Sequence, residues 1–167
     1  MFTLRPLQPD DSHAVLRLNA AAVPAVAPLD AAELTRLMAI SSLHLGVAGA
    51  GVDLAGYALV FSHDQRYDGE EFLALGRVLK APFLYIDQIV VDPTLRAVGI
   101  GRGLYGALEQ HARTLGASAL CCEVNTSPPN PASLAFHQRM GFLRLEDMAP
   151  GDGRPVALLR TDLPVRG

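Results

Sequence analysis

The sequence predicts a mixed α/β fold of the α+β kind, with one central sheet of about seven strands flanked by about four helices. Two observations carry this prediction. Apolar runs of strand length recur along the chain and are separated by segments with helical spacing. Hydrophobic residues make up 50% of the 167 residues and charged residues 19%, a balance typical of a domain that folds around its own core.

The expected elements follow in chain order. Strands are expected at residues 2–7, 43–48, 54–61, 83–91, 119–124, 142–147 and 156–161. Helices are expected from residue 10 or 11 to 22 and at residues 31–40, 101–115 and 131–140, and a short helix is allowed near 72–79. We expect one domain over residues 1–167, because the length suits a single domain and no linker or repeat interrupts the chain.

Helix boundary signals support the first part of this order. Asp10 or Asp11 can cap the first helix, and two prolines after residue 22 end it. Asp30 and Glu33 have the N-cap and N3 spacing of a capping box, which predicts the start of the second helix. The chain therefore begins strand, helix, helix.

The middle and the end of the chain alternate strands and helices. The loop Gly49-Ala-Gly51 predicts a hairpin between the second and third strands. The run F-L-Y-I-D-Q-I-V-V at residues 83–91 is too apolar for an edge, so we expect it at the centre of the sheet. Leucine and alanine recur at helical spacing up to residue 115, and Gly116 supplies a left-handed stop.

Composition excludes several functional classes. The net charge is −3, and Lys80 is the only lysine, so a basic patch for nucleic acid or for a membrane surface is not expected. Cys121 and Cys122 are adjacent and too close for an ordinary disulfide, so reduced thiols are expected. The histidines show no metal-ligand spacing, so no metal is expected. We expect a cytoplasmic protein, and a homodimer is allowed.

The most informative segment is a glycine-rich turn between the strand at 83–91 and the following helix. Gly99 and Gly101 carry no Cβ, so the backbone can turn tightly and present amides to an anion at the positive helix N-terminus. Arg96 and Arg102 flank the turn and could pair with phosphate oxygens. The spacing predicts a phosphate site, and the alternative is a surface turn with two solvated arginines.

A dinucleotide fold is one explanation of this phosphate site. Gly101, Gly103 and Gly106 spell G-x-G-x-x-G, and Glu123 follows at the end of the next strand, where an acid could bind a ribose. The first glycine of that fingerprint directly follows a strand, however, whereas nine residues separate Val91 from Gly101 here. A dinucleotide-binding oxidoreductase is therefore a remote alternative.

A family resemblance explains the turn better. Arg96, Gly99 and Gly101 form R-x-x-G-x-G after a strand ending in V-D-P, which resembles the acyl-CoA-binding motif of the GNAT N-acyltransferase superfamily. A second motif follows in the expected order, because residues 130–142 resemble the superfamily's N-P-x-(A/S)-x-x-(L/F)-(Y/H)-x-x-x-G-F signature. Further sequence around Tyr85 and Asn125 resembles an uncharacterised bacterial branch of predicted acetyltransferases.

The resemblance implies a GNAT-like fold with splayed central strands and an acetyl-CoA site at the splay. Pantetheine would pair with main-chain groups of the central strand, and the pyrophosphate would rest on amides of the glycine turn. The cofactor-binding residues that it implies are Ile89, Val90, Val91, Arg96, Ala97, Val98, Gly99, Ile100, Gly101, Arg102, Asn125, Asn130, Ser133, Phe136 and His137.

Acyl transfer from a thioester to an amine needs a neutral nucleophile, a stabilised oxyanion and a proton for the departing thiolate. In the superfamily a tyrosine usually supplies that proton, at the position of His137 here. His137 is thus a candidate acid, or instead a packing residue. Asp87 and Glu123 are the candidate bases, because carboxylates inside such apolar strands line a cleft or need a partner within the fold.

The acceptor is expected to be a small, cationic amine attacked directly in a ternary complex. Candidate substrate-binding residues are Tyr85, Asp87 and Tyr67, the last within a loop that carries four acids, Asp64, Asp68, Glu70 and Glu71. Because the proton-donor position is not tyrosine, a catalytically silent acyl-CoA-binding sensor is the alternative from another functional class.

Overall fold

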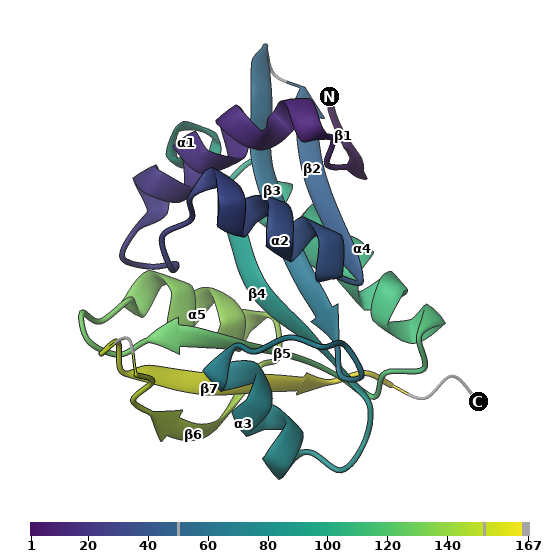
Figure 1. Ribbon diagram of the computed structural model, residues 1–167, viewed down its shortest axis with the longest axis vertical. Helices are drawn as coiled ribbons and strands as arrows, with labels where there is room; N and C mark the ends of the chain where they lie inside the picture. The colour runs from purple at the N-terminus through teal and green to yellow at the C-terminus, as the bar shows by residue number, and fades with distance from the viewer. Residues whose placement is uncertain (50, 152, 165–167) are drawn as a thin grey trace. The chain divides into compact units, whose positions relative to one another are not determined.

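The computed structural model describes residues 1–49, 51–151 and 153–164 (Figure 1). Ala50 at the tip of the predicted hairpin lies outside these ranges. The strands are β1 (Phe2–Pro6), β2 (Leu43–Gly49), β3 (Val52–Ser62), β4 (Phe83–Val91), β5 (Ala119–Asn125), β6 (Leu143–Met148) and β7 (Val156–Asp162). The helices are α1 (Ser12–Ala22), α2 (Ala31–Ile40), α3 (Glu70–Val78), α4 (Ile100–Thr114) and α5 (Pro131–Arg139), with short 3-10 turns at Pro9–Asp11 and Pro93–Leu95.

The strands pair in the order β1-β2-β3-β4-β5-β7-β6, which confirms the predicted mixed sheet of seven strands. β4 pairs with β5 in parallel, and β5 pairs with β7 antiparallel. The described residues hold five α-helices rather than about four, because the short segment near residue 72 forms the full helix α3.

The chain divides into two compact units, each made of two segments. The first unit comprises Met1–Phe61 and Asp87–Gln110, and the second comprises Ser62–Ile86 and His111–Gly167. The strand β4 contributes residues to both units. That residues 1–167 act as one domain stays a prediction.

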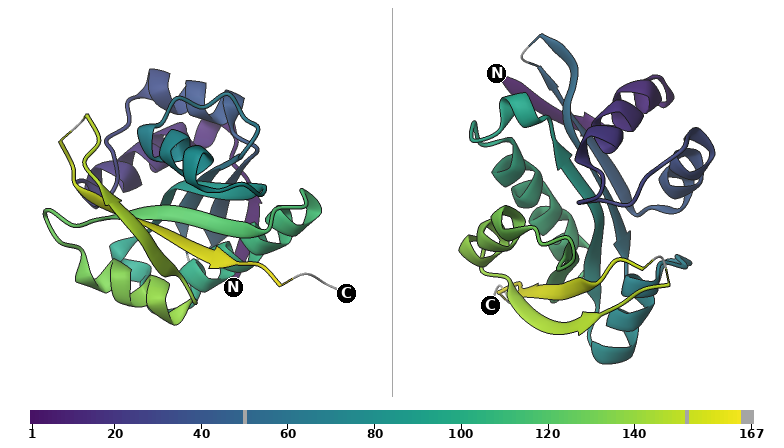
Figure 2. Two further views of the ribbon diagram at one scale, coloured as in Figure 1. Left: turned by 90° about the horizontal axis from the view of Figure 1, so that it is seen from below. Right: turned by 90° about the vertical axis from the view of Figure 1, so that its left-hand side faces the viewer.

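In the first unit, α1 and α2 lie on one face of strands β1 to β3, and α4 begins on the opposite face (Figures 1 and 2). Leucines on the two helices and on β3 are fully buried, among them Leu18, Leu34 and Leu54. The Asp30 side chain accepts a hydrogen bond from the Glu33 amide at 2.8 Å, which confirms the predicted start of α2.

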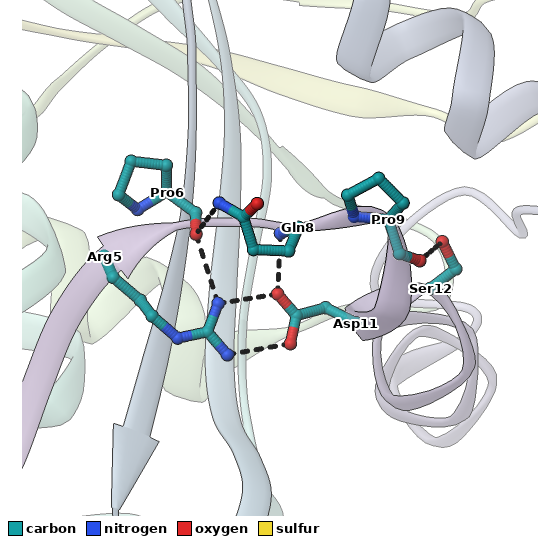
Figure 3. Close-up of polar contacts among 6 residues, drawn as sticks. All are labelled: Arg5, Pro6, Gln8, Pro9, Asp11 and Ser12. Atoms are coloured by element: carbon teal, nitrogen blue, oxygen red, sulfur yellow. Dashed lines mark hydrogen bonds and ion pairs between the residues drawn. The ribbon is translucent and has the colours of Figure 1, made fainter.

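The first helix begins differently from the prediction. Asp11 stands at the N-cap of α1, but its side chain makes no cap bond. Its carboxylate instead accepts hydrogen bonds from the Gln8 amide at 2.7 Å and from both terminal nitrogens of Arg5 at 2.7 and 2.8 Å (Figure 3). Asp11 therefore occupies the predicted N-cap position, but its carboxylate bonds to Arg5 and Gln8 and not to an amide in the first turn of α1.

In the second unit, α3 and α5 lie on opposite faces of the strands β5 and β7 (Figure 2). Cys121 and Cys122 are buried, free thiols in β5, as expected from their adjacency. Burial raises the pKa of the Cys121 thiol to about 12, so this group is inert at neutral pH. Within the described ranges, no helix combines the length and the apolar character that a membrane span requires.

Candidate functional site

The glycine turn of the first unit leads from β4 into α4. Ala97 has a φ of 65° and Gly99 a φ of 92°, so the backbone passes twice through the left-handed region within three residues. The Gly99 carbonyl accepts a hydrogen bond from the Gly103 amide at 2.9 Å, which makes Gly99 the last residue before the helix. The amides of Ile100, Gly101 and Arg102 therefore form the positive helix N-terminus at this turn.

Most side chains of the turn are exposed. Arg96, Ala97, Val98 and Arg102 are exposed, and a Cβ built on Gly99 would meet no other atom within 4 Å. The Ile100 side chain is buried and anchors the first turn of α4. The predicted phosphate-binding side chains are therefore exposed on the first unit, while the buried Ile100 side chain holds the backbone of the turn in place.

Asp92, the aspartate of the V-D-P sequence, fixes the strand side of the same turn, a role that the sequence did not predict. Its Oδ1 accepts hydrogen bonds from the Thr94 amide at 2.9 Å and from the Thr94 hydroxyl at 2.7 Å. These bonds lower the pKa of the Asp92 carboxyl. Arg17 of α1 lies 3.8 Å from the other carboxylate oxygen, and the Asp92 amide donates to the Ala55 carbonyl of β3 at 2.9 Å. The V-D-P sequence therefore anchors the turn in the fold.

The β4 residues next to this turn differ in exposure. Val90 is buried, whereas Asp87, Ile89 and Val91 alternate with the buried residues and are half-buried. Burial is the main cause of the raised pKa of Tyr57 on β3, and the charge of Asp87 adds to it. The first unit thus brings Asp87 and the main chain of 89–91 onto one strand that continues into the glycine turn.

A tyrosine and a carboxylate pair in the second unit. The Tyr85 hydroxyl of β4 donates a hydrogen bond to the Glu123 Oε2 of β5 at 2.6 Å. Tyr85 is buried and Glu123 is half-buried, so the phenol meets the carboxylate at the edge of the core. The predicted carboxylate inside an apolar strand therefore has a partner within the fold, one of the two explanations that the sequence left open.

Aromatic rings surround this pair. The Tyr67 ring stacks on Tyr85 with centroids 6.3 Å apart and an interplanar angle of 29°. Phe72 of α3 contacts both rings, at 5.5 Å from Tyr67 and 5.7 Å from Tyr85. Tyr67, which was predicted to bind substrate, thus lies directly beside the Tyr85–Glu123 pair.

The acids near Tyr67 do not share one environment. Asp64, Asp68 and Glu70 are exposed, but Glu71 is 9% exposed and belongs to the buried face of α3. The Glu70 carboxylate accepts a hydrogen bond from the Gly151 amide, which fastens the β6–β7 loop to the start of α3. Glu71 therefore does not contribute to an exposed acidic loop around Tyr67.

The start of α5 carries the second sequence motif. The Asn130 side chain accepts a hydrogen bond from the Ser133 amide at 3.2 Å and so caps the helix. At the other end of the preceding turn, Arg154 donates to the Asn125 Oδ1 at 3.0 Å. The sequence did not predict this contact of Arg154, because Arg154 lies in a loop and its partner is 29 positions away.

The His137 side chain of α5 is buried and not exposed to solvent. It is 5% exposed, and its ring contacts Phe136 and Phe142 edge-on at 5.6 and 5.1 Å. Its Nδ1 is 2.7 Å from the Ser133 carbonyl oxygen, a bond in which Nδ1 carries the hydrogen. Burial lowers the pKa of His137, so the ring is neutral at pH 7.

Replacing His137 with Phe is expected to make stability less sensitive to acid. Because burial lowers the pKa of His137 in the folded state, the unfolded chain binds its proton first as the pH falls below about 6.5. This contribution to stability is thus present above about pH 6.5 and is lost as the pH falls toward the folded-state pKa. Urea unfolding at about pH 7.5 and about pH 5.5 measures the loss, which should be smaller in His137→Phe than in the wild type.

Two other histidines also contribute to the loss of stability at low pH. Burial lowers the pKa values of His44 and His111 as well, so part of the decrease in unfolding free energy should persist in the variant. An acid loss of equal size in both proteins would contradict a buried, neutral His137.

In the described ranges, no cluster of three or more His, Cys, Asp or Glu side chains is arranged to hold a metal ion.

Solved structures share this fold at low sequence identity. The ribosomal-protein-S18-alanine N-acetyltransferase from Escherichia coli matches with a TM-score of 0.73 and 19% identity, over 100% of this chain and 97% of that one. Ard1 from Thermoplasma volcanium matches with a TM-score of 0.77 and 17% identity, over 98% of each chain. Arabidopsis thaliana NAA60, solved in complex with acetyl-CoA, matches with a TM-score of 0.75 and 13% identity, over 98% of this chain and 100% of that one.

These likenesses establish the fold, and no curated protein matches the chain. The family itself comes from a sequence profile described as "Acetyltransferase (GNAT) family", which matches residues 18–142. That range contains the glycine turn, the Tyr85–Glu123 pair and the capped helix α5. It covers most of the chain, and the chain therefore belongs to the acetyltransferase (GNAT) family.

Proposed function

We propose that the protein transfers the acetyl group of acetyl-CoA to the primary amine of a small, cationic acceptor, by direct attack within a ternary complex. The observation that carries the proposal is the Tyr85–Glu123 hydrogen bond beside the Tyr67 ring. A half-buried carboxylate next to aromatic faces suits a cationic amine, because it attracts the charge and can then accept its proton.

We propose that the glycine turn binds the acetyl donor, acetyl-CoA. We place the pyrophosphate on the amides of residues 96–102, where the helix N-terminus of α4 and the exposed Arg96 and Arg102 both favour an anion. The pantetheine arm would pair with main-chain groups of Ile89 and Val91. An N–H near Ile89 or Val90 would donate to the oxyanion of the tetrahedral intermediate.

The reaction needs no covalent enzyme intermediate. Glu123 takes a proton from the acceptor ammonium, and the freed nitrogen lone pair attacks the thioester carbonyl. The new C–N bond forms, the C–S bond breaks, and the CoA thiolate takes up the second proton that the attacking nitrogen loses when it becomes an amide. His137 is buried and neutral, so we assign it to packing and not to the transfer of that proton.

We further propose that the enzyme prefers a cationic acceptor. Asp64 and Asp68 are exposed acids in the loop that carries Tyr67, and their field raises the local concentration of a cationic acceptor. Attraction of this kind between exposed charges weakens as salt screens them.

A thiol-release assay with acetyl-CoA and a panel of amines tests the function. The panel contains spermidine, lysine, a tripeptide with a free N-terminus, glucosamine 6-phosphate and ethanolamine. We expect the highest kcat/KM for a cationic member, with a KM that rises with ionic strength. Preference for the anionic amino sugar would refute the cation preference, and tight acetyl-CoA binding without any turnover would favour the silent sensor.

Replacing Arg96 with Ala is expected to weaken CoA binding by about tenfold, the loss of one charge-assisted contact to phosphate. Dephosphorylated pantetheine should lose much less affinity, since it lacks the pyrophosphate. Calorimetric titration of wild type and variant with both ligands measures the difference. Equal losses for the two ligands would mean that Arg96 does not contact phosphate.

A further inference from the structure

Gly56 of β3 lies against the main chain of β4 in the first unit. The residue is buried, and an ideal Cβ built on it would stand 2.7 Å from the Val90 carbonyl oxygen and 3.4 Å from the Val91 Cα. Real Cβ atoms essentially never come within 3.0 Å of such a neighbour. The obstructing oxygen belongs to the backbone, so it cannot turn aside as the end of a long side chain can. Position 56 therefore accepts only glycine while β4 keeps its present course.

A main-chain hydrogen bond holds the two strands together next to this contact. β3 and β4 are neighbours in the sheet, and the Asp92 amide donates to the Ala55 carbonyl at 2.9 Å. The strands therefore cannot separate here to admit a side chain without losing that bond. The Cγ2 of Ile100 stands 3.5 Å from the same Cβ position, an ordinary van der Waals distance. The restriction on residue 56 thus comes from β4 and not from α4.

The same contact indicates how the peptide unit between Val90 and Val91 is oriented. Cβ atoms stand out of the plane of a sheet, whereas the carbonyls of a regular strand lie near that plane and point to the neighbouring strand. A carbonyl oxygen 2.7 Å from a Cβ position therefore leans out of the plane, toward the face on which a side chain of residue 56 would stand. Because the peptide unit is planar and trans, the Val91 N–H points the opposite way.

Gly46 of β2 is crowded in a different way. A Cβ on Gly46 would stand 2.8 Å from the Cδ2 of Leu7 and 2.9 Å from the Cδ1 of Leu54. Both atoms are the ends of flexible side chains, which can move to other rotamers. Gly46 and Gly56 are both buried in the first unit, but only Gly56 of these two meets the backbone of β4.

We propose that Gly56 is a positioning residue, which lets the Val90–Val91 peptide unit adopt the orientation in which it pairs with the pantetheine arm of acetyl-CoA. The pairing itself rests on the proposed function, which places pantetheine along Ile89 and Val91. Gly56 is assigned no contact with acetyl-CoA or with the acceptor. Its effect passes through the main chain of β4, so it should appear in the binding of pantetheine and not in the binding of the pyrophosphate.

The test compares Gly56→Ala with the wild type, both as the full chain. Calorimetric titration gives the Kd for acetyl-CoA and for adenosine 3′-phosphate 5′-diphosphate, which is the nucleotide part of CoA without pantetheine. We expect the acetyl-CoA Kd to rise about tenfold, through the loss of one or two main-chain hydrogen bonds, and the nucleotide Kd to change less than about twofold. The NMR resonance of the Val91 amide should also shift, because its peptide unit turns.

Gly46→Ala is the matched control. It adds the same methyl group to a buried glycine of the same unit, but against leucine side chains and not against β4. Its melting temperature should fall, while both Kd values and the Val91 resonance stay near those of the wild type. If Gly56→Ala does not fold, it is combined with Gly106→Ala, which adds a Cβ to α4 where nothing lies within 4 Å and should stabilise that helix. Gly106→Ala alone is then the reference.

Each other result decides against a stated part. An unchanged Val91 resonance in Gly56→Ala would overturn the orientation of the peptide unit. A shifted resonance with wild-type affinity for acetyl-CoA would overturn the positioning role, as would equal losses for the two ligands or a loss that Gly46→Ala reproduces. A wild-type protein that binds neither acetyl-CoA nor the nucleotide would refute the proposed donor site instead, and the Val91 resonance would still decide the orientation.

Discussion

Gly99→Val is expected to weaken acetyl-CoA binding by about 100-fold or more while the protein still folds. Gly99 has a φ of 92°, a conformation that a β-branched residue adopts only at a cost of about 1–3 kcal/mol. The valine would either hold its side chain over the amides that face the pyrophosphate or pull the turn away from them. A Cβ at this position meets no protein atom within 4 Å, so the loss comes from the lost anion seat and not from a clash in the core.

Gly106→Ala is the control for this prediction. Gly106 lies in the interior of α4, where an added Cβ also meets nothing within 4 Å. Alanine there should leave acetyl-CoA binding unchanged and stabilise the helix by about 0.5–1 kcal/mol. Calorimetric titration with acetyl-CoA and thermal unfolding measure both properties, and normal affinity of Gly99→Val would remove the glycine turn from the binding site.

Glu123→Gln is expected to lower kcat by roughly 10²–10⁴-fold with little change in the acetyl-CoA KM. Glutamine keeps the shape of the side chain and an oxygen that can accept the Tyr85 hydrogen bond, but it cannot take the proton of the ammonium. The fall in kcat therefore isolates the proton-accepting role from packing. Rapid thiol detection at saturating acetyl-CoA measures it.

Two further variants show which residue is responsible for the fall in kcat. Tyr85→Phe removes the hydroxyl that orients Glu123 and should reduce kcat less than Glu123→Gln does. Asp87→Asn, the same change at the other candidate carboxylate, should leave most of the activity. If Asp87→Asn carries the large loss and Glu123→Gln does not, the base is Asp87 and the role given to Glu123 is wrong.

Local signals in the sequence predicted most of the fold. The Asp30 cap, the apolar run at 83–91 and the glycine turn place α2, β4 and α4 nearly to the residue. The resemblance to the GNAT superfamily and the assignment as an acetyltransferase are confirmed by the family match. The predicted elements depend on short stretches of chain in which the spacing of residues carries the physical meaning, whereas the family match spans residues 18–142.

The interactions that the sequence did not predict join residues far apart in the chain. Arg154 binds Asn125 across 29 positions, and Gln88 binds the Ala27 carbonyl across 61. Asp11 is the N-cap residue of α1 but makes no cap bond, because its carboxylate pairs with Arg5 of β1, six positions away. Polar contacts between residues that only the folded chain brings together produce no pattern that can be recognised in a single sequence.

Calorimetric titration of the full chain with acetyl-CoA, and separately with NAD, decides which ligand the glycine turn binds. We place an acyl-CoA pyrophosphate on the turn at residues 96–102, so acetyl-CoA should bind saturably at one site per chain and NAD should give no binding heat. Saturable binding of NAD with no response to acetyl-CoA would refute this placement and restore the dinucleotide explanation of the same glycines.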